Sequence, residues 1–392
     1  MILANLAAGF CAATTAAHLA TIVIAAFRCR RRTAQAFFTG TVPAVSVLRP
    51  VCGIENYLTE TLASSFQLNH PDYEVIFCAA RQDDPAVAIV RRIIETNPEL
   101  PGRLLIGDDG IASNPKLGNL VKGWDAARHE WIVIVDSNVM MTPDFADRLF
   151  AAWRADTGVV CSMPIGSRPK TFPAELECAF LNTLQARFQY VSEALNWGFA
   201  QGKTMLFRRN IVDAAGGIQA LAADTAEDAA TTKLVRGAGL RVHLVDRPVE
   251  QPLGRRQLGE IWARQLRWAR LRRVSFPLLF LPELLMGSVL PSLALVLALA
   301  DYGFTVSMAA VLLLLAIWLG AEAVLARAVG WHFTPRTAMA LLVRDLLLPA
   351  LWIAAWLGND YVWRGNRVTA MPRQDWQLCP DIDESPLPEL DG

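Results

Sequence analysis

Several common signatures are missing from this 392-residue chain. After the apolar segment Val45 to Leu48 the chain continues Arg49-Pro-Val-Cys-Gly53, with neither Gly-x-Gly-x-x-Gly nor a Walker lysine, so a dehydrogenase or a kinase is disfavoured. The formal net charge is zero, so the global charge gives no reason to expect nucleic acid as a partner. The seven cysteines include no Cys-x-x-Cys pair, which is typical of reduced thiols packed as small apolar side chains.

Charged residues are also absent from Met1 to Phe27, a segment longer than the roughly 20 residues that cross a bilayer. Four arginines follow at once, at positions 28, 30, 31 and 32, and basic residues directly after a first span favour the cytoplasmic side. A cleaved signal peptide would carry its basic residues before the apolar part. We therefore expect residues 1–27 to be a transmembrane anchor and the domain that follows to lie in the cytoplasm.

Further apolar segments fill the last third of the chain. Phe276 to Ala300 carries Glu283 as its one charge, Phe304 to Gly320 carries none, and Thr337 to Gly358 is interrupted by Arg344-Asp345. Adjacent opposite charges either neutralise one another in a span or mark an interfacial or re-entrant helix, so two to three membrane helices are expected in residues 276–360. Residues 371–392 hold six acids against Arg373, which predicts a disordered or loosely docked acidic tail.

Residues 40–250 read as one α/β domain. Apolar, β-branched segments begin 28 or 29 residues apart, near Val45, Glu74, Arg103, Trp131 and Val159. This spacing suits a strand followed by a crossover helix, and helices are expected over residues 55–66, 85–95, 116–128 and 143–153. The pattern predicts a mainly parallel sheet with helices on both faces, whose ligands bind beyond the carboxyl ends of the strands.

Carboxylates follow two of these strands. Asp136 ends the apolar segment that starts at Trp131, and there it can reach a divalent cation that bridges two phosphates, or it merely caps a turn. Asp136 and Asn138 are the candidate ligands for Mg²⁺ or Mn²⁺, although Asp-x-Asn offers fewer anionic ligands than Asp-x-Asp. Asp83 and Asp84 precede Pro85, so one of them can cap a helix while the other accepts hydrogen bonds from a nucleobase or ribose.

Three later segments add further candidate site residues. Lys116 opens a helix after Asn114-Pro115 and can contact phosphate there, or it is simply solvated. Glu227-Asp228 begins another helix, where acids are ordinary, but the loop at Gly202 allows close backbone approach to a sugar or acceptor. Asp228, beside Glu227, is our general base, with Gly202 near the acceptor.

The segment Arg264-Gln-Leu-Arg267-Trp268 lies in a predicted amphipathic helix within residues 251–275. The two arginines and the tryptophan share one face, where an arginine can neutralise diphosphate and Trp268 can stack beside the sugar or acceptor. Such a helix beside an apolar span also lies on anionic lipid, a role that suits the arginines at positions 255, 256, 270, 272 and 273.

Taken together, these pieces resemble the ceramide glucosyltransferases, which add glucose from UDP-glucose to ceramide. The resemblance runs from about Val45 to Arg273 and rests on Asp83 to Ala86, Asn114 to Lys116, Asp136 to Asn138, Ala226 to Asp228 and Arg264 to Trp268. It implies a GT-A type nucleotide-diphospho-sugar transferase fold with a Rossmann-like mixed sheet, in a multi-pass protein of a bacterial inner membrane. It further implies donor binding at Asp84, diphosphate or metal binding at Asp136 and base catalysis at Asp228.

Two departures from that family leave the acceptor open. Asn138 stands where the family usually has glycine, and Leu181 to Tyr190 lacks the His-Pro of animal members. Related bacterial enzymes glycosylate diacylglycerol or hopanoids instead of ceramide. A processive polysaccharide synthase, which shares the carboxylates but usually has more spans, and a non-catalytic lipid-binding or sugar-sensing protein are the alternatives. The leading hypothesis is an inverting lipid glucosyltransferase.

Overall fold

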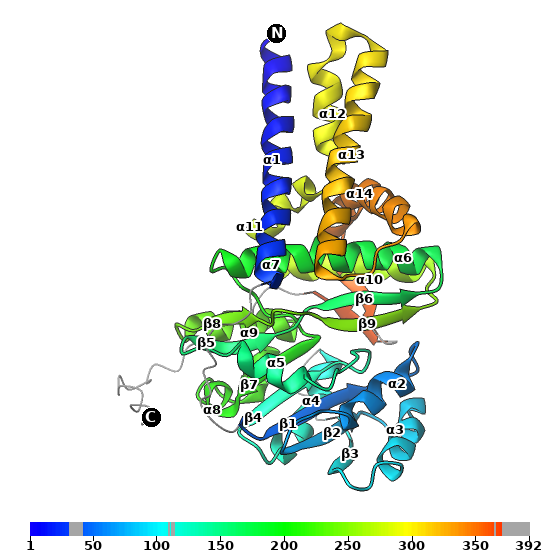
Figure 1. The fold of residues 1–392 in the computed structure, drawn as a ribbon. Helices are drawn as coiled ribbons and strands as arrows, with labels where there is room; N and C mark the ends of the chain where they lie inside the picture. Colours follow the sequence, from blue (N-terminus) through cyan, green and yellow to red (C-terminus); the bar gives the residue numbers. More distant parts are fainter. Residues whose placement is uncertain (31–41, 109, 111–113, 364–365, 371–392) are drawn as a thin grey trace.

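The computed structural model describes residues 1–30, 42–108, 110, 114–363 and 366–370. Its elements follow the long axis of the molecule (Figure 1): a sheet domain at one end, a layer of long helices above it, and helices that stand away from this layer at the other end. The predicted acidic tail, residues 371–392, lies outside the described residues.

The main sheet has seven strands in the order β3-β2-β1-β4-β7-β5-β8. The first four run parallel to one another, which confirms the expected strand-helix repeat. The sheet as a whole is mixed, because β7 runs antiparallel between β4 and β5. The strands are β1 (Val45–Val51), β2 (Tyr73–Ala79), β3 (Gly102–Ile106), β4 (Trp131–Val135), β5 (Thr157–Cys161), β7 (Thr204–Arg208) and β8 (Arg241–Leu244).

The antiparallel strand β7 begins at the edge of the sheet where β4 ends. Since β7 starts opposite the carboxyl end of β4, the residues just before it arrive at the edge where ligands bind. The backbone N–H of Asp136 donates to the carbonyl of Lys203 at 3.0 Å, so the two chain segments are joined there.

Helices cover both faces of the sheet, as expected. Side chains of successive strand residues point to opposite faces, and α4 (Pro115–Ala126) packs on one face through Leu117 and Trp124, against Ile76 and Ile132. The opposite face carries α2 (Leu58–Ala63), α3 (Pro85–Glu95) and α5 (Phe145–Ala151). Both α3 and α4 begin with proline after a side-chain cap, and these caps bring polar groups to the carboxyl ends of the strands.

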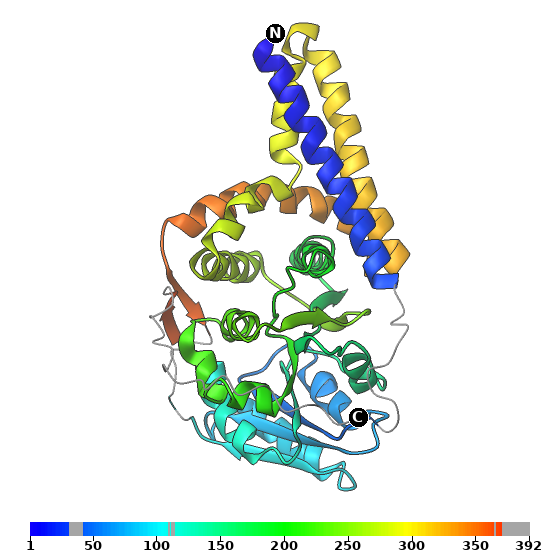
Figure 2. The same cartoon turned by 90° about the vertical axis from the view of Figure 1, so that its left-hand side faces the viewer.

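A layer of long helices lies between the sheet and the outer helices (Figures 1 and 2). It contains α6 (Phe172–Ala179), the π-helix η2 (Phe180–Ala186), α7 (Arg187–Ala194), α10 (Leu258–Ser275) and α14 (Pro335–Trp356). Smaller elements complete the chain: η1 (Ser64–Phe66), β6 (Pro164–Pro169), α8 (Arg209–Asp213), η3 (Ile218–Ala223), α9 (Glu227–Gly237), β9 (Val249–Gly254), α11 (Pro277–Phe280), η4 (Leu281–Met286), η5 (Ala300–Tyr302), β10 (Asp360–Trp363) and β11 (Asn366–Thr369).

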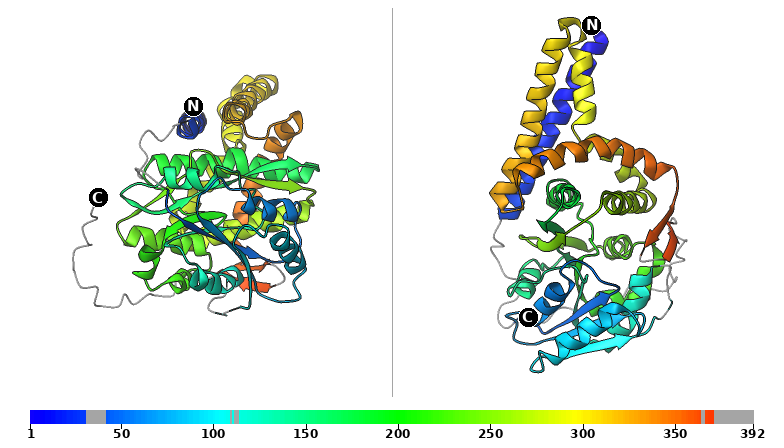
Figure 3. Two further views of the ribbon diagram at one scale, coloured as in Figure 1. Left: turned by 60° about the horizontal axis from the view of Figure 1, so that its bottom comes forward. Right: turned by 90° about the vertical axis from the view of Figure 1, so that its right-hand side faces the viewer.

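Among the described residues, three helices are long and apolar enough to cross a membrane: α1 (Ile2–Arg30), α13 (Phe304–Val329) and α14. A fourth span results if residues 277–286 and α12 (Val289–Ala298), which are bent by 58°, count as one. These helices differ in orientation (Figure 3): α1, α12 and α13 stand side by side, whereas α14 lies crosswise at their base. There it packs against α6 and α10.

The paired charges of α14 are fully buried. The Arg344 guanidinium contacts Asp345 at 2.6 Å and Glu322 of α13 at 2.8 Å, and Arg187 of α7 approaches the same Glu322 at 3.4 Å. At the other side of the layer, Arg28 of α1 contacts Glu193 at 2.6 Å. Opposite charges therefore fix the outer helices on the helix layer.

Removing Glu322 tests this anchoring. Glu322→Ala leaves the buried arginines 187 and 344 short of a carboxylate, so the free energy of unfolding in detergent should fall by about 3–5 kcal/mol. Exposed Glu99→Ala is the control, with an expected change within about 0.5 kcal/mol. Equal unfolding curves for the two variants would show that the network does not hold the layers together.

Candidate active site

One ammonium group, that of Lys116, contacts three other predicted site residues. Lys116 Nζ lies 2.7 Å from Asp136 Oδ1 at the end of β4 and 2.7 Å from Glu227 Oε1 at the start of α9. It also donates to the carbonyl of Gly202 at 2.6 Å. Burial disfavours the charged amine, but the two carboxylates raise the pKa of Lys116 above its usual range. A solvated lysine, the alternative considered for the sequence, is therefore wrong.

The start of α4 holds this arrangement in place. Asn114 is the N-cap: its Oδ1 accepts from the backbone N–H of Lys116 at 2.9 Å, which orients the lysine at the head of the helix. The Nδ2 of Asn114 donates to Glu227 Oε2 at 2.6 Å. Both oxygens of Glu227 are thus held by side chains from the first turn of α4, and α9 is positioned by them.

Asp136 is held from a second side by Lys203. Lys203 Nζ lies 2.7 Å from Asp136 Oδ2 and 3.1 Å from Asn138 Oδ1. Burial would raise the pKa of Asp136, but Lys116 and Lys203 hold it well below its usual range. Asp136 is therefore a fixed anion between two ammonium groups. Lys203 was not among the predicted site residues, although its place directly after Gly202 was a signal.

The turn that carries Asp136 is fixed from below by Arg49, which the sequence did not single out as a site residue. This side chain of β1 is fully buried, and its Nη2 donates to the carbonyls of Asp136 at 2.8 Å and of Val139 at 2.9 Å. Burial lowers the pKa of Arg49 to about 9. An arginine inside a strand of seven buried residues acts here as a positioning residue.

The glycine at position 202 is required by close approach. A Cβ there would lie 2.8 Å from Glu227 Oε1 and 3.4 Å from Asp228 Oδ2. The backbone N–H of Gly202 donates to Asp228 Oδ2 at 3.1 Å. The backbone thus approaches the acids closely, and the same loop orients Asp228.

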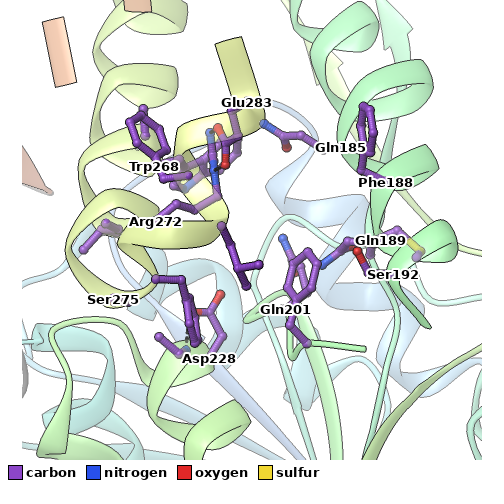
Figure 4. Close-up of a pocket in the computed structure, with 18 of the residues that line it drawn as sticks. Gln185, Phe188, Gln189, Ser192, Gln201, Asp228, Trp268, Arg272, Ser275 and Glu283 are labelled. Atoms are coloured by element: carbon purple, nitrogen blue, oxygen red, sulfur yellow. Dashed lines mark hydrogen bonds and ion pairs between the residues drawn. The ribbon is translucent and has the colours of Figure 1, made fainter. Parts of the chain in front are cut away.

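Asp228 faces an apolar cavity of about 330 Å³ (Figure 4). Burial first, and then the neighbouring charge of Glu227, raises the pKa of Asp228 to about 6. Trp268 of α10 lines the same cavity, as do Gln185, Phe188 and Ser192 from η2 and α7. A carboxyl with such a pKa is ionised near neutrality yet basic enough to accept a proton.

The predicted metal ligands, Asp136 and Asn138, both contact Lys203. Among the described residues, no three His, Cys, Asp or Glu side chains gather in a way that would hold a metal. Asp136 Oδ2 and Asn138 Oδ1 do face one point, where Lys203 Nζ now lies. Their chemistry fits a hard cation, provided that Lys203 withdraws and a ligand such as diphosphate adds oxygens.

The two acids before α3 separate in the structure. Asp84 is the cap: its Oδ1 accepts from Ala86 N at 2.8 Å and from Gly53 N at 2.9 Å. Asp83 points to solvent and pairs with Arg81 at 2.5 Å. The cap therefore falls on Asp84, the residue to which the family resemblance gave donor binding.

The arginines of α10 are engaged inside the protein. Arg264 forms an ion pair with the fully buried Glu177, and Trp268 packs beside Cys178 and Leu253 while it lines the cavity. Burial raises the pKa of Tyr361 to about 12, and the positive charge of Arg267 opposes this rise.

The outer arginines of α10 differ from the expectation that they lie on lipid. Arg272 contacts Glu283 at 2.6 Å, Arg273 donates to Asn359, and α14 packs over the helix. The sequence did not indicate these contacts, because Asn359 is distant in the chain and Glu283 lies in an apolar segment.

Fold and site together define a membrane-associated glycosyltransferase of the GT-A class. The model of glycosyl transferase family 21 matches residues 13–375, and the chain belongs to that family. It is 26% identical over 333 residues to ceramide glucosyltransferase 1 of Caenorhabditis elegans, covering 83% of this chain and 72% of the relative. It is 25% identical over 433 residues to the ceramide glucosyltransferase of Pyricularia oryzae, covering 85% of each. The protein is thus a hexosyltransferase.

The fold agrees with a solved structure. The mannosyltransferase PcManGT from Pyrobaculum calidifontis, in complex with GDP-Man and Mn²⁺, superposes with a TM-score of 0.52 at 19% identity. The match covers 90% of this chain and 98% of the other. At that identity the likeness shows the fold alone.

Replacing the central lysine should affect both stability and activity. Lys116→Met leaves Asp136 and Glu227 facing each other without their shared cation, so we expect a loss of about 3 kcal/mol in the free energy of unfolding. Activity should fall about 10²–10³-fold. Lys122→Met, on the same helix but bonded to Gly107 and Asn119, is the control and should cost about 1 kcal/mol. Comparable losses in both variants would contradict the central role of Lys116.

The raised pKa of Asp228 predicts a pH profile. A base works when ionised, so kcat/KM should fall about tenfold per pH unit below about 6. Glu227→Gln removes a negative neighbour, which lowers the pKa of Asp228 and should move the midpoint to lower pH. Initial rates measured from pH 4.5 to 8 check both. A midpoint that stays in place or moves upward in Glu227→Gln would count against Asp228 as the titrating base.

Proposed function

We propose that the protein transfers glucose from UDP-glucose to the primary hydroxyl of ceramide, with inversion at the anomeric carbon. The observation that carries this proposal is the position of Asp228 at the wall of an apolar cavity. Above Asp228, that cavity is enclosed by η2, α7, α10 and α14 of the helix layer, together with the short helices α11 and η4. A base at the wall of a pocket with apolar walls suits a lipid hydroxyl better than a water-soluble acceptor.

The residues then take separate roles. Asp228 removes the proton from the acceptor hydroxyl as this oxygen attacks the sugar, and Gly202 N–H keeps the carboxylate oriented. Trp268 contacts the acceptor or sugar in the cavity. Lys116 and Lys203 lie where negative charge develops on the departing diphosphate, and they stabilise it electrostatically.

The groups available support inversion. Direct displacement needs one base on the acceptor side and no covalent nucleophile. Asp228 supplies that base, whereas Asp136 and Glu227 are fixed in ion pairs with lysine. A single displacement, with Asp228 as base, is the mechanism that these contacts support.

The donor is assigned to the carboxyl ends of β1, β2 and β4. We assign Asp83 and Asp84 to the nucleoside and the arginines 264 and 267, with Lys116, to the diphosphate. Asp136 and Asn138 would hold Mg²⁺ or Mn²⁺ when it is bound, and the cation would neutralise part of the diphosphate charge.

The outer helices fit a membrane enzyme whose catalytic domain faces the cytoplasm of a bacterium. Arginines at the end of α1 follow an uncharged span, which favours the cytoplasmic side. With α10 and the crosswise α14 at the membrane surface, the cavity would open at the level of lipid head groups.

Membranes of a heterologous host that carry the chain should label added ceramide when supplied with radioactive UDP-glucose. Asp228→Asn should reduce this transfer about 10²–10⁴-fold while UDP-glucose binding stays the same, whereas exposed Asp125→Asn should transfer like the wild type. Label on diacylglycerol or a hopanoid would change the acceptor, and a water-soluble high-mass product would favour a polysaccharide synthase. No lipid-linked label from any UDP-sugar would overturn the proposal.

A further inference from the structure

A second apolar cavity adjoins the one that contains Asp228. This side cavity has a volume of about 370 Å³ and lies between α10, η2 and α14. Three residues line both cavities: Phe180, Gln265 and Leu351. Its other lining residues are Leu258, Gly259, Ile261, Trp262, Val343 and Leu347.

Gln265 is a polar residue in the partition between the two cavities, which is otherwise apolar. Its side chain is 3% exposed, and its Oε1 accepts from Gln185 Nε2 at 3.0 Å. Its Nε2 has no hydrogen-bond partner within the part of the chain that the structure describes. A buried donor without a partner is unfavourable, so a bound molecule that supplies an acceptor atom would remove this penalty.

We propose that Gln265 determines acceptor specificity by donating from Nε2 to an acyl carbonyl of the lipid, with the lipid's two chains divided between the two cavities. This inference rests on the proposed function, because it assumes that the acceptor hydroxyl reaches Asp228. Gln265 is a specificity residue in this scheme, and Asp228 remains the base.

The chemistry of the partition favours a carbonyl. The free group is an N–H donor, so the ligand must offer an acceptor atom. The walls on both sides are apolar, so the acceptor atom must sit where two hydrocarbon chains diverge. An amide carbonyl of ceramide and an ester carbonyl of diacylglycerol both satisfy this, because each lies close to the free hydroxyl.

The position of the pair within the cavity agrees with this reading. Figure 4 shows Gln185, the partner of Gln265, and Asp228 pointing into the same cavity at different levels. A lipid whose hydroxyl is at Asp228 therefore extends toward Gln185 and Gln265. Phe180 and Gln185 lie on a π-helix, and π-helical turns often mark functional sites.

A matched pair of lipids tests the proposal. Diacylglycerol and dialkylglycerol of equal chain length differ in the carbonyl, and each is used as an acceptor or, where it is not glycosylated, as a competitor of ceramide transfer. The wild-type enzyme should prefer the ester by about three- to tenfold, the value of one neutral hydrogen bond. In Gln265→Leu the ratio should fall to about one, through the acceptor KM and not through kcat or the KM for UDP-glucose.

Two further variants separate recognition from packing. Gln265→Met keeps nearly the size of the side chain but carries no hydrogen-bond donor, so it should also lose the preference for the ester. Gln185→Leu leaves the Gln265 donor in place and should retain most of it. An ester preference that persists in both Gln265 variants overturns the proposal, as does an equal loss on ester and ether lipids, which indicates a packing defect.

The same experiment shows which lipid supplies the carbonyl, and it also tests the proposed function. Higher kcat/KM for ceramide assigns the amide carbonyl, and higher kcat/KM for diacylglycerol assigns the ester. Transfer to a lipid without any effect of Gln265 rejects this inference alone. Absence of transfer to every lipid rejects the proposed function, and the specificity role with it.

Discussion

The contact of Lys116 with two carboxylates is the constraint on which the rest of the site depends. Its ammonium group joins the end of β4 to the start of α9, at 2.7 Å from Asp136 and from Glu227. These elements are separated by 91 positions in the chain, and without a cation between them the acids would repel each other. Because Glu227 is held, the first turn of α9, which also carries Asp228, is held with it, and the N–H of Gly202 then orients the Asp228 carboxylate.

A second set of charges places this site against the membrane helices. Arg344 with Glu322, and Arg28 with Glu193, bond the outer helices to the layer above the sheet. The apolar cavity lies inside that layer, so its walls come from both the soluble and the membrane-facing parts of the chain. The two charge networks have separate structural roles. Lys116 fixes the end of β4 against α9, and the pairs of Arg344 and Arg28 fix the outer helices on the layer that holds the cavity.

Much of the sheet domain follows from the sequence, because a period of 28 or 29 residues is a local signal of strand and helix. The strand β7 and the role of Lys203, which directly precedes it, were not predicted, since antiparallel insertion is set by pairing with β4 and not by periodicity. The same holds for Arg49, whose partners are carbonyls of a distant turn. For α10 we expected Arg264 to contact diphosphate and Arg272 to lie on lipid. Their ion pairs with Glu177 and Glu283 were not predicted, because Glu177 is distant in the chain and Glu283 lies in an apolar segment.

The central claim is that one carboxylate in an apolar cavity acts as the base in a single displacement. The anomeric configuration of the glycolipid product, determined by proton NMR, tests this most directly. UDP-glucose carries an α-linked sugar, so transfer with Asp228 as base and no covalent intermediate gives a β-linked glycolipid. An α-linked product would contradict the claim, because retention requires a second displacement or a different arrangement of the reacting groups.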